Sequence, residues 1–271
     1  MKQKSWLHAA AWILTAAFLL PLLMMFLSSF MTGGELEVVY ETDEPFRWIP
    51  YKVTLEGYWR LLFASETYIA TFWNSMLIAL VSVFLHAVVS VIAGYALARG
   101  RFRGRTTLFF LYVLIMLMPF QVTLLPNYIM AKDLGIYNTW LALILPSAFA
   151  PLGVFLVRQF VLNMPDDILQ AAYLDTSSNL RILLSIVAPN IWPGILTVAI
   201  LAFAECWNMV EQPLILIEDE WLYPLSMQLN SLDGASMAIR FPGAVFYVVP
   251  AVLLYFIFEN ELVDGVTHMK I

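Results

Sequence analysis

Hydrophobic residues occur along this chain in long blocks that short polar passages separate. A helix needs about 20 apolar residues to cross the hydrocarbon core of a bilayer. Blocks of about this length, or somewhat shorter, cover residues 7–27, 75–97, 108–130, 139–157, 182–204 and 244–258. The pattern therefore predicts an all-α, polytopic membrane protein with six transmembrane helices.

The composition agrees with this prediction. The 271 residues are 61% hydrophobic and 13% charged, whereas soluble domains carry roughly 25% charged residues. Lys2 and Lys4 precede the first apolar block, which is too long for a signal peptide and is interpreted as an uncleaved span. The net charge of −6 argues against nucleic-acid binding. The only cysteine, Cys206, lies in an apolar block, so disulfides play no part.

The charged residues between the blocks indicate an orientation. With six spans, the basic residues of the short connections fall on one side, which the positive-inside rule makes cytoplasmic. These are Lys2, Lys4, Arg99, Arg101, Arg103, Arg105, Arg158 and Arg181. The other side holds the acidic residues Glu35, Glu37, Glu41, Asp43 and Glu44, followed later by Glu218, Asp219 and Glu220. We therefore expect both termini in the cytoplasm, an extracellular loop at 31–71 and a cytoplasmic tail at 259–271.

Prolines interrupt the third, fourth and fifth blocks. Such residues bend a membrane helix, and neighbouring helices can satisfy the carbonyls that lose their donors. Two interpretations stay open, namely packing kinks or bent helices around a translocation path. The residues are Pro119, Pro146, Pro151, Pro189 and Pro193.

An amphipathic passage, residues 163–194, stands out between the apolar blocks. Pro165 suits the first position of a helix, and two aspartates follow where the helix dipole favours carboxylates. Ile168, Ala171, Ala172 and Asp175 then share one face, which is small and suits insertion into a groove of another protein. Residues 176–179 interrupt the helix and offer caps for a second one, and Asp175 is a further candidate cap. The alternative is a plain juxtamembrane helix with a capped break.

This passage resembles the cytoplasmic coupling loop of ABC-importer permeases. In that family Glu-Ala-Ala is followed, three residues on, by Asp-Gly and later by Leu-Pro. The corresponding positions here are Gln170-Ala171-Ala172, Asp175-Thr176 and Ala188-Pro189. Glycine at such a turn usually marks a positive φ, which a threonine tolerates poorly. Either the turn at Thr176 or the groove that receives the loop is therefore expected to differ.

The resemblance extends from about Phe46 to the C-terminus. It rests on Asn74-Ser75, on 93–99 and 102–105, on Met118-Pro119, and on Trp207-Asn208 and Pro213-Leu214. These segments are similar to the carbohydrate-uptake branch of ABC importers, and specifically to the shorter permease of the maltose type. The resemblance implies a type I importer permease fold over 1–271 as a single domain, with core spans at 75–258 and a coupling loop at 163–182. The ATPase-coupling residues it implies are Gln170, Ala171, Ala172, Asp175, Thr176 and Pro189.

The resemblance also implies partners. These are a second permease subunit that forms a heterodimer with this one, a cytoplasmic ABC ATPase dimer and an extracytoplasmic sugar-binding protein. Membrane lipid surrounds the spans, in a bacterial-type plasma (inner) membrane. The chain lacks a glycine-rich phosphate loop ending in Gly-Lys-Ser/Thr, so we expect ATP hydrolysis in a separate subunit and no enzymatic activity here. No cofactor or metal site is expected, since His8, His86 and His268 are isolated.

Four polar or aromatic residues are candidates for the substrate path. Asn208 beside Trp207 offers an amide and an aromatic ring, which suit a sugar, and Glu205 and Gln121 could join them. The alternative is hydrogen bonding between helices. At the level of the whole protein, an ion-coupled secondary transporter and a non-transporting membrane scaffold subunit remain the competing hypotheses.

Overall fold

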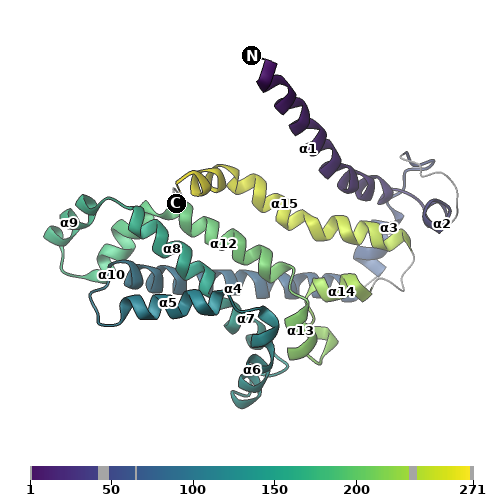
Figure 1. Ribbon diagram of the computed structural model, residues 1–271. Coiled ribbons are helices and arrows are strands. Elements are labelled where there is room, and N and C mark those ends of the chain that lie inside the picture. The colour runs from purple at the N-terminus through teal and green to yellow at the C-terminus, as the bar shows by residue number, and fades with distance from the viewer. Residues whose placement is uncertain (1, 42–48, 65, 232–236, 269–271) are drawn as a thin grey trace. The chain divides into compact units, whose positions relative to one another are not determined.

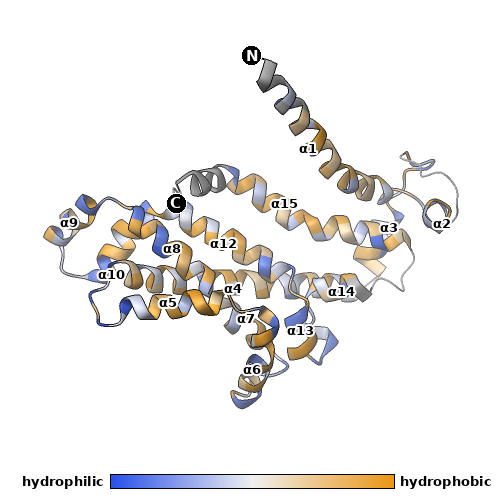
Figure 2. Ribbon diagram, viewed as in Figure 1, coloured by the Kyte–Doolittle hydropathy of each residue, from blue (hydrophilic) through white to orange (hydrophobic). Residues whose placement is uncertain are grey.

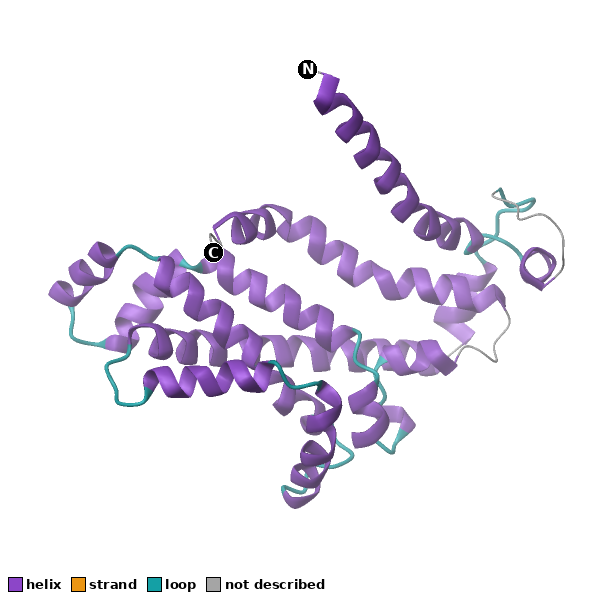
Figure 3. Cartoon of the chain, viewed as in Figure 1, coloured by secondary structure: helices purple, strands orange, loops and turns teal. Residues whose placement is uncertain are grey.

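The computed structural model describes residues 2–41, 49–64, 66–231 and 237–268, so Asp43 and Glu44 of the charge argument lie outside the described residues. Within these ranges the regular secondary structure is helical throughout (Figure 3). The chain divides into two compact units, one of Met1–Ala70 with Met227–Pro250 and one of Thr71–Ser226 with Ala251–Ile271. The predicted all-α fold is confirmed.

The first unit contains most of the segment that the sequence assigned to a loop at 31–71. That segment holds α2 (Gly33–Glu41), α3 (Glu56–Trp59), a π-helical turn (Arg60–Ala64) and the start of α4, which begins at Glu66. Gly57 of α3 packs against α15 (Met237–His268), and a Cβ there would lie 2.2 Å from the Ala238 carbonyl oxygen. The described part of the predicted extracellular loop therefore contains short helices, and its extracellular location stays a prediction. The unit also contains α1 (Lys2–Ser28).

Long helices form the body of the second unit. The helices α4 (Glu66–Arg99), α5 (Arg105–Met116), α8 (Pro151–Asn163) and α12 (Trp192–Trp207) run alongside one another, and their surfaces are mostly hydrophobic (Figures 1 and 2). Glycines allow their close approach: a Cβ on Gly94 would lie 2.7 Å from Val157 Cγ1, and one on Gly194 would lie 2.4 Å from Phe160 Cδ2. Small residues at helix contacts are typical of membrane bundles.

Short helices gather at the two ends of α4. On the side of its first half lie α6 (Phe120–Asp133), α7 (Leu141–Ala148), α13 (Glu211–Leu216) and a 3-10 turn (Glu220–Leu222), while α14 (Leu225–Ser231) starts in this unit and continues into the first. The Asn74 amide donates to the carbonyls of Trp221 (2.7 Å) and Tyr223 (3.1 Å), which ties this group to α4. At the opposite end of α4 lie α9 (Asp166–Asp175) and α10 (Asn179–Ile182), followed by a π-helical turn (Leu183–Val187) and α11 (Ala188–Asn190).

Four described helical segments are long and apolar enough to cross a membrane: Ala10–Ser28, Thr67–Arg99, Leu141–Asn163 and Met237–Glu259. Two bent pairs pass the same test, Arg105–Met116 with Phe120–Asp133 at 103° and Asn179–Asn190 with Trp192–Trp207 at 81°. Pro119 stands at the first bend and Pro193 just after the second. The count reaches six if each bent pair is one span, so the six-span topology stays a prediction.

Candidate functional site

The helix α9 begins where the sequence indicates a helix start. Pro165 has extended backbone angles (φ −55°, ψ 134°) and immediately precedes the helix instead of occupying its first position. Asp166 and Asp167 then fill the first turn, where the dipole favours their carboxylates. The predicted start is therefore correct to within one residue.

Arg99, the last residue of α4, attaches α9 to the rest of the unit. Its Nη1 donates to Asp166 Oδ1 at 2.5 Å, and its Nη2 donates to the carbonyls of Val161 (3.3 Å) and Met164 (3.0 Å). An exposed ion pair alone contributes little to stability. Here the planar guanidinium also satisfies carbonyls at the end of α8, so a single side chain sets the angle between α8 and α9.

The inner face of α9 packs on its own chain. Leu169 and Ala172 are buried, at 4% and 2% exposure, in a cluster that includes Tyr95 and Ala98 of α4 and Ile182 of α10. The sequence predicted Ala172 on the face that enters a partner's groove, whereas the structure buries this side chain within its own chain.

The outer face of α9 consists of Asp167, Gln170, Ala171 and Leu174, all of them exposed. Leu174 is 89% exposed and the neighbouring Tyr173 is 45% exposed. The sequence analysis identified Gln170 and Ala171 but missed Leu174. The signal was available, because Leu174 follows Gln170 by four residues and so shares its face.

The turn after α9 does not need glycine. Thr176 has φ −155° and ψ 143°, an extended conformation that β-branched residues favour. The difference from glycine at this position is therefore compatible with the backbone found here. The next helix is capped by Ser178, whose Oγ accepts from the Arg181 N–H at 3.4 Å, so the prediction that Asp175 caps it is wrong. Pro189, exposed in α11, lies farther along the same connection.

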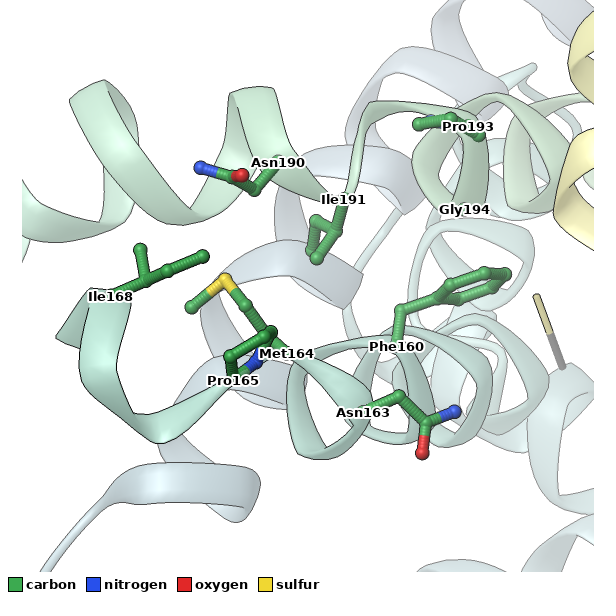
Figure 4. A pocket seen from close by; sticks show the side chains of 9 residues that line it. All are labelled: Phe160, Asn163, Met164, Pro165, Ile168, Asn190, Ile191, Pro193 and Gly194. Carbon is green, nitrogen blue, oxygen red and sulfur yellow. The ribbon is translucent and has the colours of Figure 1, made fainter. Parts of the chain in front are cut away.

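A hollow of about 300 Å³ opens beside the start of α9 (Figure 4). Its walls come from the end of α8, the first turn of α9 and the break between α11 and α12. Met164, Ile168 and Ile191 give it an apolar character, and Asn163 and Asn190 stand at its edges (Figure 4). The two ends of the passage 163–194 are thus brought together around this hollow.

Of the predicted substrate-path residues near the end of α12, Trp207 is buried, whereas Glu205 and Asn208 are exposed. Trp207 is 1% exposed, and its ring stacks on Phe203 with centroids 5.4 Å apart. Asn208 is exposed and its amide donates to the Ala204 carbonyl at 2.7 Å. A role for Trp207 in stacking on a sugar is therefore at odds with its burial in this chain. Glu205, near the end of α12, is exposed.

Gln121 lies near the beginning of α6, where its amide donates to the Glu211 carboxylate oxygens at 3.3 and 3.2 Å. The acidic segment 218–220 lies at the same end of the unit and is fixed by Asn138, whose Oδ1 accepts from the N–H groups of Glu218 (2.8 Å) and Asp219 (3.0 Å). Asn138 has φ 57°, a left-handed conformation that asparagine tolerates. Desolvation and a hydrogen bond to Glu218 raise the pKa of Tyr137.

Curated relatives match nearly the whole chain. An arabinooligosaccharides transport system permease protein, AraQ, of Halalkalibacterium halodurans is 31% identical over 267 residues and covers 95% of each chain. A sulfoquinovosyl glycerol transport system permease protein, SmoH, of Agrobacterium fabrum is 30% identical and covers 95% of this chain and 91% of its own. Among solved structures, a bacterial ABC transporter involved in the import of alginate matches with a TM-score of 0.81 at 19% identity, covering 96% of this chain and 97% of that one. This last match confirms the permease fold.

The family model described as "binding-protein-dependent transport system inner membrane component" matches residues 87–260, more than half of the chain. Members are permease subunits of ABC importers, in which ATP hydrolysis resides in a separate subunit. This chain therefore belongs to the family of inner membrane components of binding-protein-dependent transport systems, as a multi-pass permease subunit that is not itself an enzyme.

Proposed function

We propose that this chain lines, with a second permease subunit, the path by which an ABC importer takes up a sugar or oligosaccharide. The named solutes of AraQ and SmoH, together with nearly full-length similarity, support a carbohydrate as the substrate class. The binding protein of the system delivers the sugar from outside. A cytoplasmic ATPase dimer receives α9.

The outer face of α9 is the observation that carries the coupling part of the proposal. Single exposed leucines are ordinary on protein surfaces. Leu174, however, is 89% exposed beside the exposed Tyr173, on a short helix that Arg99 and a buried inner face hold in place. A rigid helix that presents an apolar side chain to water suits a groove in a partner.

The attachment of α9 explains how a pull on it would reach the membrane spans. Its inner face packs on α4 and α10, and Arg99 links its first turn to the end of α8. Displacement of α9 by closing ATPase subunits would therefore move the ends of α4 and α8 together. The two permeases would then change from inward-facing to outward-facing, and reopening of the ATPases would release the sugar inside.

The proposed orientation places α9 in the cytoplasm with both termini. Within the second unit, α9 lies at the same end of α4 as Arg99, Arg101, Arg103 and Arg105, and the acidic segment 218–220 lies at the other end. This separation of charge supports the positive-inside assignment. A cysteine at Gln170 should react with a membrane-impermeant maleimide in inverted vesicles and not in intact cells. Labelling of intact cells would refute the orientation.

The coupling role is tested with Leu174→Asp in vesicles reconstituted with the full transporter. Burial of a leucine contributes about 1.5–3 kcal/mol, and a carboxylate in its place adds a desolvation cost. We expect ATPase activity stimulated by the binding protein to fall at least about tenfold, while Leu174→Met, of similar volume, retains it. Unchanged stimulation in Leu174→Asp would refute docking through this face.

A further inference from the structure

An open groove of about 670 Å³ runs along the last turns of α4, on the side that faces α10. Apolar side chains line one part of it: Ile92 and Ala96 from α4, Leu180 from α10 and Leu183 just after it. Arginines line the other part, Arg99 at the end of α4 and Arg101 in the loop that follows. The groove is thus apolar over one stretch and cationic over another.

The cationic end continues into the loop between α4 and α5. A second hollow of about 580 Å³ opens on residues 100–107 and shares Gly100 and Arg101 with the groove. Arg99 is engaged by Asp166, and Arg105 donates to the carbonyls of Ala98 (3.2 Å) and Gly100 (2.9 Å). Arg101 and Arg103 are exposed, and within the described part of the chain no carboxylate pairs with either. Two guanidinium groups therefore face the groove and its extension without a counter-charge.

The position of the groove indicates what could fill it. The segment Thr67–Arg99 is long and apolar enough to cross a membrane, and the groove occupies its last two turns and the following loop. If this span ends at the membrane surface near Arg99, the groove lies where acyl chains give way to lipid headgroups. Ile92 (53% exposed) and Leu180 (63% exposed) then lie at the level of the chains, and Arg101 and Arg103 at the level of the phosphates.

We propose that this groove binds an anionic phospholipid. Its acyl chain packs on Ile92, Ala96 and Leu180, and its headgroup phosphate pairs with Arg101 and Arg103. Planar guanidinium groups suit phosphate oxygens, and basic pockets where spans meet the cytoplasmic surface suit anionic headgroups. Tyr173 of α9 and Asn179 of α10 also border the groove, so the lipid braces the segment that carries the outer face of α9. The inference depends on membrane embedding and not on ATPase docking.

The test uses the transporter purified with its partner subunits, delipidated and then supplied with phosphatidylglycerol or phosphatidylcholine of identical acyl chains. Retained lipid is counted by native mass spectrometry. We expect preferential retention of phosphatidylglycerol and a loss of about tenfold or more in Arg101→Gln/Arg103→Gln, since each arginine near an anionic headgroup contributes about fivefold. The control Arg60→Gln, which removes an arginine of the first unit, should retain lipid like the wild type.

A second variant separates the apolar part from the charges. Ile92→Trp fills the groove while leaving every arginine in place, and it should also release the lipid. Equal retention of the two lipids, or wild-type retention in both variants, would overturn the proposal. Displacement of the lipid by inorganic phosphate alone would show a simple phosphate site. A cross-link from a cysteine at Arg101 to a partner subunit would show a protein contact. Either result overturns the lipid assignment. Loss of coupling in Leu174→Asp with lipid still retained would leave this inference standing.

Discussion

Gly153 of α8 lies at the closest approach of this helix to α4. A Cβ there would lie 2.2 Å from His86 Nε2 and 2.2 Å from Ser90 Oγ. The His86 ring is 4% exposed and is held by a hydrogen bond of 3.0 Å between its Nδ1 and the Ser147 carbonyl. Pro151, four residues after Ser147, has no N–H for that carbonyl, which accepts instead from the Ala150 N–H at 3.3 Å and from the histidine.

Gly153→Ala changes the free energy of unfolding in two opposite ways, by improving helix propensity and by crowding the contact with α4. Alanine improves helix propensity by at most about 1 kcal/mol. The added methyl group overpacks the contact at a cost of about 1–3 kcal/mol, and displacing the His86 ring breaks a buried hydrogen bond at about 1–3 kcal/mol more. We therefore expect a net loss of about 1–6 kcal/mol in the free energy of unfolding, because the two costs together exceed the gain.

Thermal unfolding of the purified protein in detergent provides the assay. Gly34→Ala is the matched control, since a Cβ at this helical glycine meets nothing within 4 Å. His86→Ala should make room for the methyl group, so the double variant should lose less stability than the two single variants together, with a coupling of about 0.5–3 kcal/mol. If Gly153→Ala unfolds like Gly34→Ala, or if the two changes are additive, the close contact that we describe does not limit stability.

Three further predictions concern α9 and its attachment. Leu169→Ala should lower the free energy of unfolding by about 2–5 kcal/mol because this side chain is buried. Leu174→Ala, on the outer face, should change it by less than about 0.5 kcal/mol. Equal shifts in thermal unfolding would contradict a helix with one buried and one exposed face. Ser178→Ala should destabilise α10 by about 1 kcal/mol because it removes the cap, whereas Asp175→Ala should leave the stability of α10 unchanged. Limited proteolysis of the loop should therefore be faster in Ser178→Ala alone. Arg99→Lys keeps the positive charge but removes the planar guanidinium group, whose two terminal nitrogens bind Asp166 and the Met164 carbonyl. Amide hydrogen exchange in residues 166–175 should therefore accelerate. Unchanged exchange would mean that the buried face alone holds α9.

The hydrophobic blocks predicted the all-α fold correctly because segment length and hydropathy are local properties of the chain. The helices within the segment 31–71 could not be predicted from the sequence, because they depend on distant parts of the chain. The helix Gly33–Glu41 is too short to show a clear period, and its Leu36 and Val39 are buried by tertiary packing, at 0% and 8% exposure. Isolated helices of this length are marginal, so the fold and not the local sequence makes this one.

The candidate site shows the same division between local and distant causes. The start of α9 follows from Pro165 and the two aspartates beside it, which the sequence displays directly. The face that α9 turns inward depends on Arg99 and Tyr95, about 70 residues earlier along the chain, and no local pattern contains that information. The sequence therefore assigned Ala172 to the partner and overlooked Leu174.

The structure separates the two alanines of α9: Ala171 is exposed and Ala172 is buried. Ala172 is buried in a cluster of its own chain, so its small size is consistent with packing inside this chain. A partner would touch Asp167, Gln170, Ala171 and Leu174, and Thr176 lies in an extended turn that accepts its side chain without strain. Of the three differences from the family's motif, at Gln170, Thr176 and Ala188, only the one at Gln170 lies on the outer face of α9 that the proposal assigns to the partner. Restoring glutamate there should alter the affinity for the ATPase while leaving thermal unfolding unchanged, and a shift in unfolding with unaltered affinity would reverse this assignment.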